Sequence, residues 1–187
     1  LYTEYTSRKD IRFSVRGMET EEADFGALVR DPWSNRTDTV LAKITPLFEE
    51  ELDRNKFAER FEKGDVAVNA CGFRMSNIWN GQYGLNVWNM LHTEERGIAW
   101  PAHFTFDLGV QAELSRIKYW QRLDSGGGWL YAHGNPRTFE IWGRADQPDP
   151  NSEWDGWTLL TTCESIKPSN LPPGLGQWTA EDLEHPS

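Results

Sequence analysis

Apolar and polar residues alternate along several short stretches of the chain, and this period of two is typical of half-buried β-strands. In the first third of the sequence the alternation predicts strands at residues 11–16, 23–30 and 37–45. After a charged interval, further strands are predicted at 66–73, 103–108, 114–121, 137–142 and 157–161. Turn residues separate these stretches and no long helical period intervenes, so the sequence predicts an all-β sandwich.

The charged interval at 47–64 predicts a linker with one or two helical turns, because its apolar residues fall partly at spacings of three to five. We therefore divide the chain into three parts. They are about half a sandwich at 1–46, the linker at 47–64 and a second β domain at 65–187.

The composition is rich in aromatic side chains, with ten tryptophans, nine phenylalanines and five tyrosines in 187 residues. Aromatic residues favour strands, and exposed ones form flat binding platforms, although most of them can equally belong to a core. The formal net charge of -10 repels phosphate, which excludes nucleic acid and anionic membranes as partners. No apolar run approaches the roughly 20 residues that span a bilayer, so no membrane-spanning segment is predicted.

The sequence offers no recognisable catalytic motif. Its four histidines are scattered, without the spacing of a helical metal site and without a Gly-x-Ser-x-Gly nucleophile turn. Most acidic residues fall in the linker or in turns, so an enzyme is not predicted. The oxygen-rich turn at 146–152 could wrap calcium, but it lacks the spacing of an EF-hand, and no cofactor is predicted. Cys71 and Cys163 lie in no CxxC pattern and are interpreted as two buried free thiols, with a disulfide between them as the alternative.

The order of four motifs carries a resemblance to a known family. The sequence Phe-Thr-Phe-Asp-Leu-Gly at 104–109 is followed by an arginine-bearing stretch at 114–122, a Phe-Glu-Ile-Trp stretch at 136–143 and a Trp-Asp-Gly-Trp turn at 154–157. This series resembles the discoidin domain, also called the coagulation factor five/eight (F5/8) type C domain, which is a galactose-binding-like jelly roll. Asn80 stands where many members have an Asp-Gly turn, and this departure counts against a calcium site near that turn.

The closest form of this resemblance is to discoidin-like proteins that Bacteroides-type bacteria export. The run Pro-Leu-Phe-Glu-Glu-Glu-Leu-Asp at 46–53 is similar to a run in those proteins, where an immunoglobulin- or fibronectin-like segment precedes the discoidin-like domain. The resemblance implies a partial immunoglobulin-like segment at 1–46 and a discoidin-like jelly roll at 65–187. It also implies a periplasmic or cell-surface protein that binds glycans or other cell-surface ligands.

A jelly roll has eight strands, and fewer are predicted before the chain ends at Ser187. An incomplete sandwich would expose unpaired sheet edges, which natural proteins avoid. We therefore expect the last strands of the discoidin-like domain, and the first strands of the segment at 1–46, to lie beyond this sequence.

The glycine-rich loop at 122–136 has the composition of a sugar-binding site. Sugar rings present C–H faces that pack on aromatic rings, while their hydroxyl groups need fixed donors and acceptors. Three glycines permit tight turns in this loop. The alternative is an ordinary hairpin loop whose aromatic side chains pack back onto the sandwich. The candidate ligand-binding residues are Arg122, Trp129, Tyr131, His133 and Asn135.

We therefore predict a non-catalytic, exported binding module for carbohydrate or cell-surface ligands. The alternative function is a structural or adhesion module that contacts protein partners through the same loops. A glycoside hydrolase would need a pair of carboxylates at a set separation, and nothing in the sequence favours one. The turn from Trp154 to Trp157 is interpreted as a marker of the fold, with Trp157 packing inward.

Overall fold

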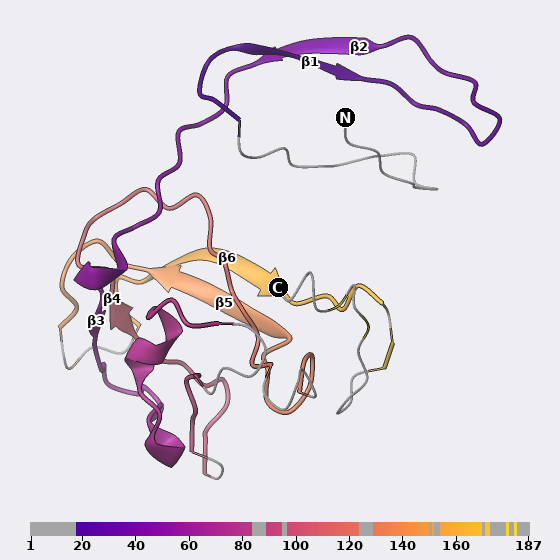
Figure 1. Cartoon of the computed structure of the whole chain (residues 1–187). Coiled ribbons are helices and arrows are strands. Elements are labelled where there is room, and N and C mark those ends of the chain that lie inside the picture. Colours follow the sequence, from indigo (N-terminus) through magenta and orange to yellow (C-terminus); the bar gives the residue numbers. More distant parts are fainter. Residues whose placement is uncertain are drawn as a thin grey trace. The chain divides into compact units, whose positions relative to one another are not determined.

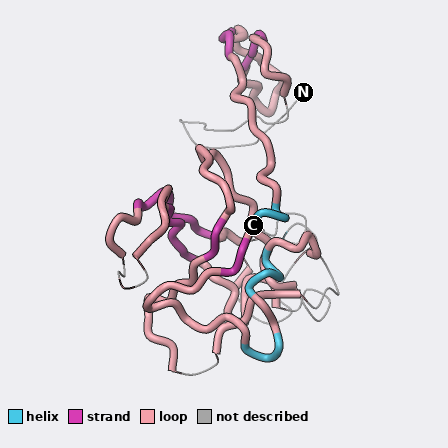
Figure 2. Tube along the Cα trace, turned by 90° about the vertical axis from the view of Figure 1, so that its left-hand side faces the viewer, coloured by secondary structure: helices cyan, strands magenta, loops and turns pink. Residues whose placement is uncertain are grey.

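A computed structural model describes residues 18–83, 89–94, 97–123, 129–149, 151, 154–169, 171–172, 179 and 182 (Figure 1). The chain divides into two compact units, Leu1–Glu51 and Leu52–Ser187. The fold is all-β, as predicted, with short antiparallel strand pairs and 3-10 turns joined by long loops (Figure 2). Within the described residues, no helix has the length and apolar character that a membrane span requires. The strand predicted at 11–16 lies outside these residues, and the identities assigned to the parts of the chain stay predictions.

The described part of the first unit is a β-hairpin. Strand β1 (Ala23–Ala27) pairs antiparallel with β2 (Val40–Ile44), and both strands fall within their predicted ranges. The connecting loop turns where the sequence has Asp-Pro. The Asp31 carboxylate accepts hydrogen bonds from the backbone N–H groups of Trp33 and Asn35 at 3.0 and 2.8 Å, which fixes the turn.

In the second unit the longest pair is β5 (Thr138–Gly143) with β6 (Thr158–Glu164). The two strands are antiparallel, with a register shift between Ile141 and Trp142. Side chains along β5 alternate between exposed and half-buried, as the alternation in the sequence requires. The pair confirms the two strands predicted near the carboxyl end of the chain.

A shorter pair joins β3 (Ala58–Glu59) to β4 (Phe106–Asp107). The predicted linker contains β3 and η1 (Arg54–Lys56). Its one helical turn is therefore a 3-10 turn and not an α-helical turn. Gly109 follows β4 with a φ of 66°, and a Cβ at this position would lie 2.2 Å from the carbonyl oxygen of Lys56. Only glycine therefore fits where the loop after β4 crosses the linker.

Two predicted strands do not form. At 66–73 the chain makes an isolated bridge between Asn69 and His92 and then the 3-10 turn η2 (Ala70–Gly72). At 114–121 the backbone adopts no strand, and most of the side chains are exposed. Alternation is a property of one segment, whereas a strand also needs a neighbour that continues its backbone hydrogen bonds. The segment at 66–73 makes only a few such bonds, to His92 and His103, before it turns into η2.

The core of the second unit comes mainly from irregular segments. An aromatic cluster of Phe57, Trp79 and Phe106, with ring centroids 5.4 to 6.1 Å apart, links the β3–β4 pair to the end of the 3-10 turn η3 (Met75–Ile78). Among the described residues, the buried apolar side chains are Val68, Phe73, Met75, Met90, Leu123 and Leu130. The loops of this unit are therefore packed parts of the structure.

Both cysteines are free, as interpreted, but they are not both buried. Cys71 is exposed and Cys163 is half-buried, so the prediction of two buried thiols is wrong. Cys71 has a φ of 57° within η2, and this turn replaces the strand that would have placed its side chain in a core.

Candidate functional site

The loop predicted to bind a ligand gathers several side chains around Trp129. The Arg122 guanidinium carbon lies 3.8 Å from the centroid of the Trp129 ring. The His133 imidazole stacks on the same indole, with centroids 4.2 Å apart and ring planes inclined by 29°. His133 is exposed, while Arg122 and Trp129 are half-buried. The structure thus brings three of the five predicted residues into contact, whereas the glycines at 126–128 lie outside the described residues.

Asn135 ties the two ends of this loop together. Its Nδ2 donates to the carbonyl oxygens of Arg122 and Trp129 at 3.0 and 2.8 Å. Its Oδ1 accepts a hydrogen bond from the backbone N–H of Arg122 at 2.8 Å. Both N–H donors of the amide are therefore used inside the loop. Asn135 thus fixes the backbone that carries the guanidinium and the indole, and its contact with a ligand stays a prediction.

The backbone of the loop takes an uncommon conformation. Tyr131 and His133 have φ values of 56° and 51°, in the left-handed region that favours glycine. Such a residue costs about 1–3 kcal/mol and persists where the surroundings impose it. Here the turn is closed by backbone hydrogen bonds from Ala132 to Trp129 at 3.0 Å and from Asn135 to Ala132 at 3.1 Å. The ring cluster is therefore held in one geometry before any ligand arrives.

Tyr131 supports the loop from its inner side. Its backbone N–H donates to the side-chain oxygen of Gln121 at 2.6 Å, and the buried Gln121 amide donates in turn to Ser165 Oγ. Burial, together with the nearby negative charge of Asp182, raises the pKa of the Tyr131 hydroxyl. Burial and the neighbouring Tyr131 raise the pKa of Tyr119 as well. Tyr131 is half-buried.

Asp182 is a fully buried carboxylate that sequence patterns did not reveal. It accepts hydrogen bonds from the backbone N–H of Ser169 at 2.9 Å, the Ser169 hydroxyl at 2.7 Å and the backbone N–H of Thr179 at 2.9 Å. Burial alone would raise the pKa of Asp182, but these hydrogen bonds and the charge of Lys167 outweigh it, and the pKa lies below its usual value. The partners lie 13 and 3 residues away, so no short motif signals the contact.

A second buried carboxylate, Asp65, lies behind His103. Its side chain is 2% exposed and its Oδ1 lies 3.5 Å from His103 Nε2. It accepts hydrogen bonds from the backbone N–H groups of Glu62 at 2.8 Å and Thr105 at 3.1 Å, and from the Thr105 hydroxyl at 3.1 Å. Burial raises the pKa of Asp65, against the opposing effect of these hydrogen bonds and of His103. Asp65 thus fixes the His103 ring and the loop around it.

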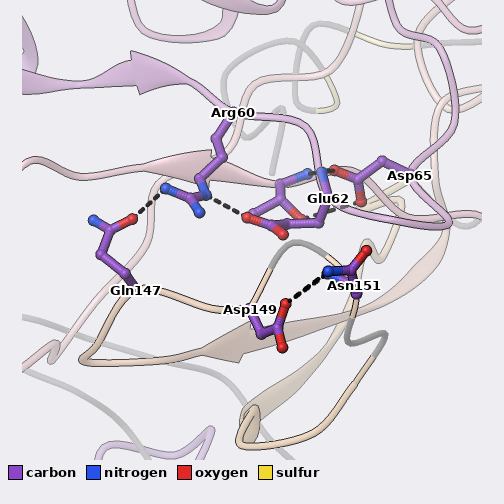
Figure 3. A network of polar contacts seen from close by, with 7 residues as sticks. Arg60, Glu62, Asp65, Gln147, Asp149 and Asn151 are labelled. Atoms are coloured by element: carbon purple, nitrogen blue, oxygen red, sulfur yellow. Dashed lines mark hydrogen bonds and ion pairs between the residues drawn. The ribbon is translucent and has the colours of Figure 1, made fainter.

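Figure 3 shows how the network continues around this carboxylate. Glu62 pairs with Arg60, which also donates to the side-chain oxygen of Gln147. In the same view, Asp149 accepts a hydrogen bond from the backbone N–H of Asn151 at 2.9 Å. A glycosidase pair needs carboxyl oxygens that face the substrate. Here Glu62 is engaged by a cation of the chain, so the arrangement favours a supporting network.

In the oxygen-rich turn at 146–152, the first carboxylate already accepts hydrogen bonds from another side chain of the protein. Asp146 accepts hydrogen bonds from Arg144 Nε and Nη2 at 2.8 and 3.1 Å. The Asn80 and Asn89 amides hydrogen-bond to each other at 2.8 and 3.2 Å, where the family resemblance had suggested an Asp. In the part of the chain that the structure describes, no group of three His, Cys, Asp or Glu side chains could hold a metal ion.

Comparisons with known proteins cover the whole chain. A family model described as a domain of unknown function, DUF5000, matches residues 79–186, and a second domain of unknown function, DUF5126, matches residues 1–55. The solved structure of the SusE-like protein BT2857 is 42% identical, with a TM-score of 0.71, over 100% of this chain and 69% of that one. No curated protein matches the chain. These comparisons leave the discoidin-like assignment as a prediction.

Proposed function

Because this chain belongs to the family of the SusE-like protein BT2857 and carries the DUF5000 domain, we propose that it is a non-catalytic, exported module that binds glycans. The relationship favours a surface binding protein over an enzyme. We also propose the finer assignment, in which 1–46 is a partial immunoglobulin-like segment, 47–64 a linker and 65–187 a discoidin-like jelly roll.

The observation that carries the proposal is the ordered cluster around Trp129. A guanidinium and an imidazole lie about 4 Å from one indole centroid, and Asn135 fixes the loop with three hydrogen bonds. Sugar-binding sites combine an aromatic surface with a few fixed polar groups, and both are present here. Because the cluster is held in place beforehand, a weakly binding sugar would lose little additional conformational freedom at it.

The charge of the chain narrows the ligand class. A net charge of -10 repels uronic acids and sulfated sugars at low ionic strength, whereas neutral polysaccharides are unaffected. We therefore propose neutral glycans as the ligands. Affinity should then change little with salt, because no charge pair between protein and ligand is screened.

The test is binding of the full chain to a panel of soluble neutral polysaccharides, namely a glucan, a mannan, a galactan and a xylan. Affinity gel electrophoresis gives a first screen and titration calorimetry the affinity. Binding to one member that weakens in Trp129→Ala and Arg122→Ala supports the proposal. Trp33→Ala is the matched control, since it removes an indole that is 80% exposed in the other unit. If the wild type binds none of the panel, the proposed function is wrong.

A second candidate function is adhesion to a protein partner. The hairpin unit favours it, because Val40 and Ile44, which share one face of β2, are 71% and 39% exposed. Exposed apolar side chains in a group mark surfaces that other proteins cover. Adhesion predicts that Val40→Lys removes a specific product of cross-linking in the native cell envelope. An unchanged set of products in this variant counts against it.

A further inference from the structure

Outside the 122–135 loop, three aromatic side chains of the second unit form a surface that we call the tryptophan platform: Trp142, Trp154 and His103. The centroids of Trp142 and Trp154 are 5.2 Å apart with planes inclined by 58°, and His103 lies 4.6 Å from Trp154 at 60°. Trp142 is 37% exposed and Trp154 43%. Two indole rings thus touch each other while both remain open to solvent.

Hydrogen bonds fix the two elements that carry these indoles. Trp142 lies on β5 and its Nε1 donates to Glu140 Oε2 at 2.9 Å, which sets the orientation of the ring. Trp154 begins the turn before β6, and Arg144 Nη1 donates to the Asp155 carbonyl in this turn at 2.6 Å. The platform is therefore preorganised, unlike a single exposed tryptophan whose rotamer is set by solvent alone.

The buried carboxylate of Asp65 orients the third ring of the platform, His103. His103 packs on Trp154, and its Nε2 faces the Asp65 carboxylate at 3.5 Å. The protein holds both oxygens of this carboxylate with backbone and hydroxyl donors. A buried carboxylate is costly unless such donors compensate for lost water, and here the compensated charge sets the His103 ring at the edge of the platform.

We propose that the tryptophan platform is a second glycan subsite, which takes the C–H face of a neutral sugar ring on Trp142 and Trp154. The inference rests on the proposed glycan-binding function and adds a site to it. Glu140, whose Oε2 accepts from Trp142 Nε1, lies beside the platform and has a second carboxylate oxygen that can accept from a sugar hydroxyl group, while its charge disfavours an anionic sugar. The turn at 154–157, interpreted from sequence as a marker of the fold, would then also bind ligand.

The platform is more open than the predicted loop. Around Trp129, the Arg122 guanidinium and the His133 ring already lie about 4 Å from the indole centroid, so less of its face is free. The indoles of Trp142 and Trp154 meet each other at a steep angle, which leaves ring area exposed on both.

The first test measures binding of the neutral polysaccharide panel to Trp142→Ala and Trp154→Ala. Each substitution should lower affinity by about 2–10-fold, the effect of one aromatic stacking contact, while Trp33→Ala changes it less than about twofold. If the wild type binds and Trp129→Ala weakens binding, but both platform variants match Trp33→Ala, the platform is no subsite and the proposed function stands. If the wild type binds nothing in the panel, both proposals are overturned.

Oxidative footprinting of the wild-type chain tests the platform even where a variant does not fold. Mild oxidation with N-bromosuccinimide, followed by peptide mass spectrometry, reports the reactivity of each tryptophan with and without the polysaccharide that binds. We expect the ligand to slow oxidation of Trp142 and Trp154 at least about twofold and to leave Trp33 unchanged. Equal rates at Trp142 and Trp154 with and without bound ligand overturn the inference.

Discussion

Replacing Asn135 tests whether one amide holds the candidate site together. Asn135→Ala removes two donated hydrogen bonds, to Arg122 and Trp129, and one accepted from the Arg122 backbone. At about 0.5–1.5 kcal/mol each, three hydrogen bonds give about 1.5–4.5 kcal/mol. Because the side chain is only half-buried and water can replace part of the loss, we expect a decrease of about 2–3 kcal/mol in the free energy of unfolding.

The assay is differential scanning calorimetry of the full chain, with urea unfolding followed by near-ultraviolet circular dichroism. A loss of this size lowers the Tm of the second unit by about 2–4 °C for each kcal/mol. Asn55→Ala is the matched control, since it removes an exposed amide that hydrogen-bonds to Asp53 at 2.9 Å and should change stability by less than about 0.5 kcal/mol. An Asn135→Ala protein as stable as the control would refute the role assigned to this amide.

Asn135→Asp separates hydrogen bonding from packing, because the shape of the side chain is kept. One carboxylate oxygen can still accept from the Arg122 N–H, while the other faces the carbonyl oxygens of Arg122 and Trp129. We expect this variant to be at least as unstable as Asn135→Ala at neutral pH. Protonation restores a donor, and the facing carbonyl oxygens favour the protonated form in the fold, so the deficit should shrink as the pH falls towards about 4. A stable Asn135→Asp protein at neutral pH would show that the two hydrogen bonds donated by the amide contribute little to stability.

Three further predictions concern the second unit. Gly109→Ala should cost about 2–4 kcal/mol of unfolding free energy in urea titrations, because its Cβ would lie 2.2 Å from Lys56 O at a positive φ; a cost below about 0.5 kcal/mol contradicts this. Asp182, whose pKa is lowered in the fold from 3.8, contributes stability that is present above that value and lost as the pH falls through the folded pKa. Asp182→Asn should therefore flatten the decline of stability in acid, and an unchanged slope would count against it. In alkylation followed by mass spectrometry, the exposed Cys71 should react faster than Cys163, and the reverse order would be inconsistent with the structure.

Local sequence patterns predicted the elements whose partners lie nearby in the chain. Alternation and an Asp-Gly turn located β5 and β6, which pair with each other across one long loop. The same alternation at 114–121 failed, because it carries no information on whether a neighbouring strand is available. Composition identified the loop with Arg122 and Trp129, since aromatic, polar and glycine residues occur there within one short stretch. It suggested candidate residues and left their roles open.

The roles depend on contacts between distant positions, which a single sequence does not contain. Gln121 reaches Ser165 across 44 residues and Thr105 reaches Asp65 across 40. Neither partner is unusual by itself, since Ser and Thr are common on surfaces. The sequence does not reveal the tryptophan platform for the same reason. His103 and Trp154 are 51 residues apart in the sequence, whereas their ring centroids are 4.6 Å apart in the structure.

Buried polar side chains hold the loops of the second unit in place where strand pairing is short. Gln121 fixes the Trp129 loop, Asp65 fixes the His103 loop, and Asp182 joins Ser169 to Thr179. A buried polar group without its partners costs about 1–3 kcal/mol, so each of these three favours one arrangement of its loop over alternatives of similar apolar burial. The candidate site at Trp129 lies on a loop anchored in this way, and the tryptophan platform includes His103, whose loop Asp65 anchors. Replacing one of these polar side chains should therefore lower glycan affinity at the site that it supports before the whole unit unfolds. Replacing an apolar core residue such as Met75 or Leu130 should instead lower the stability of the whole unit.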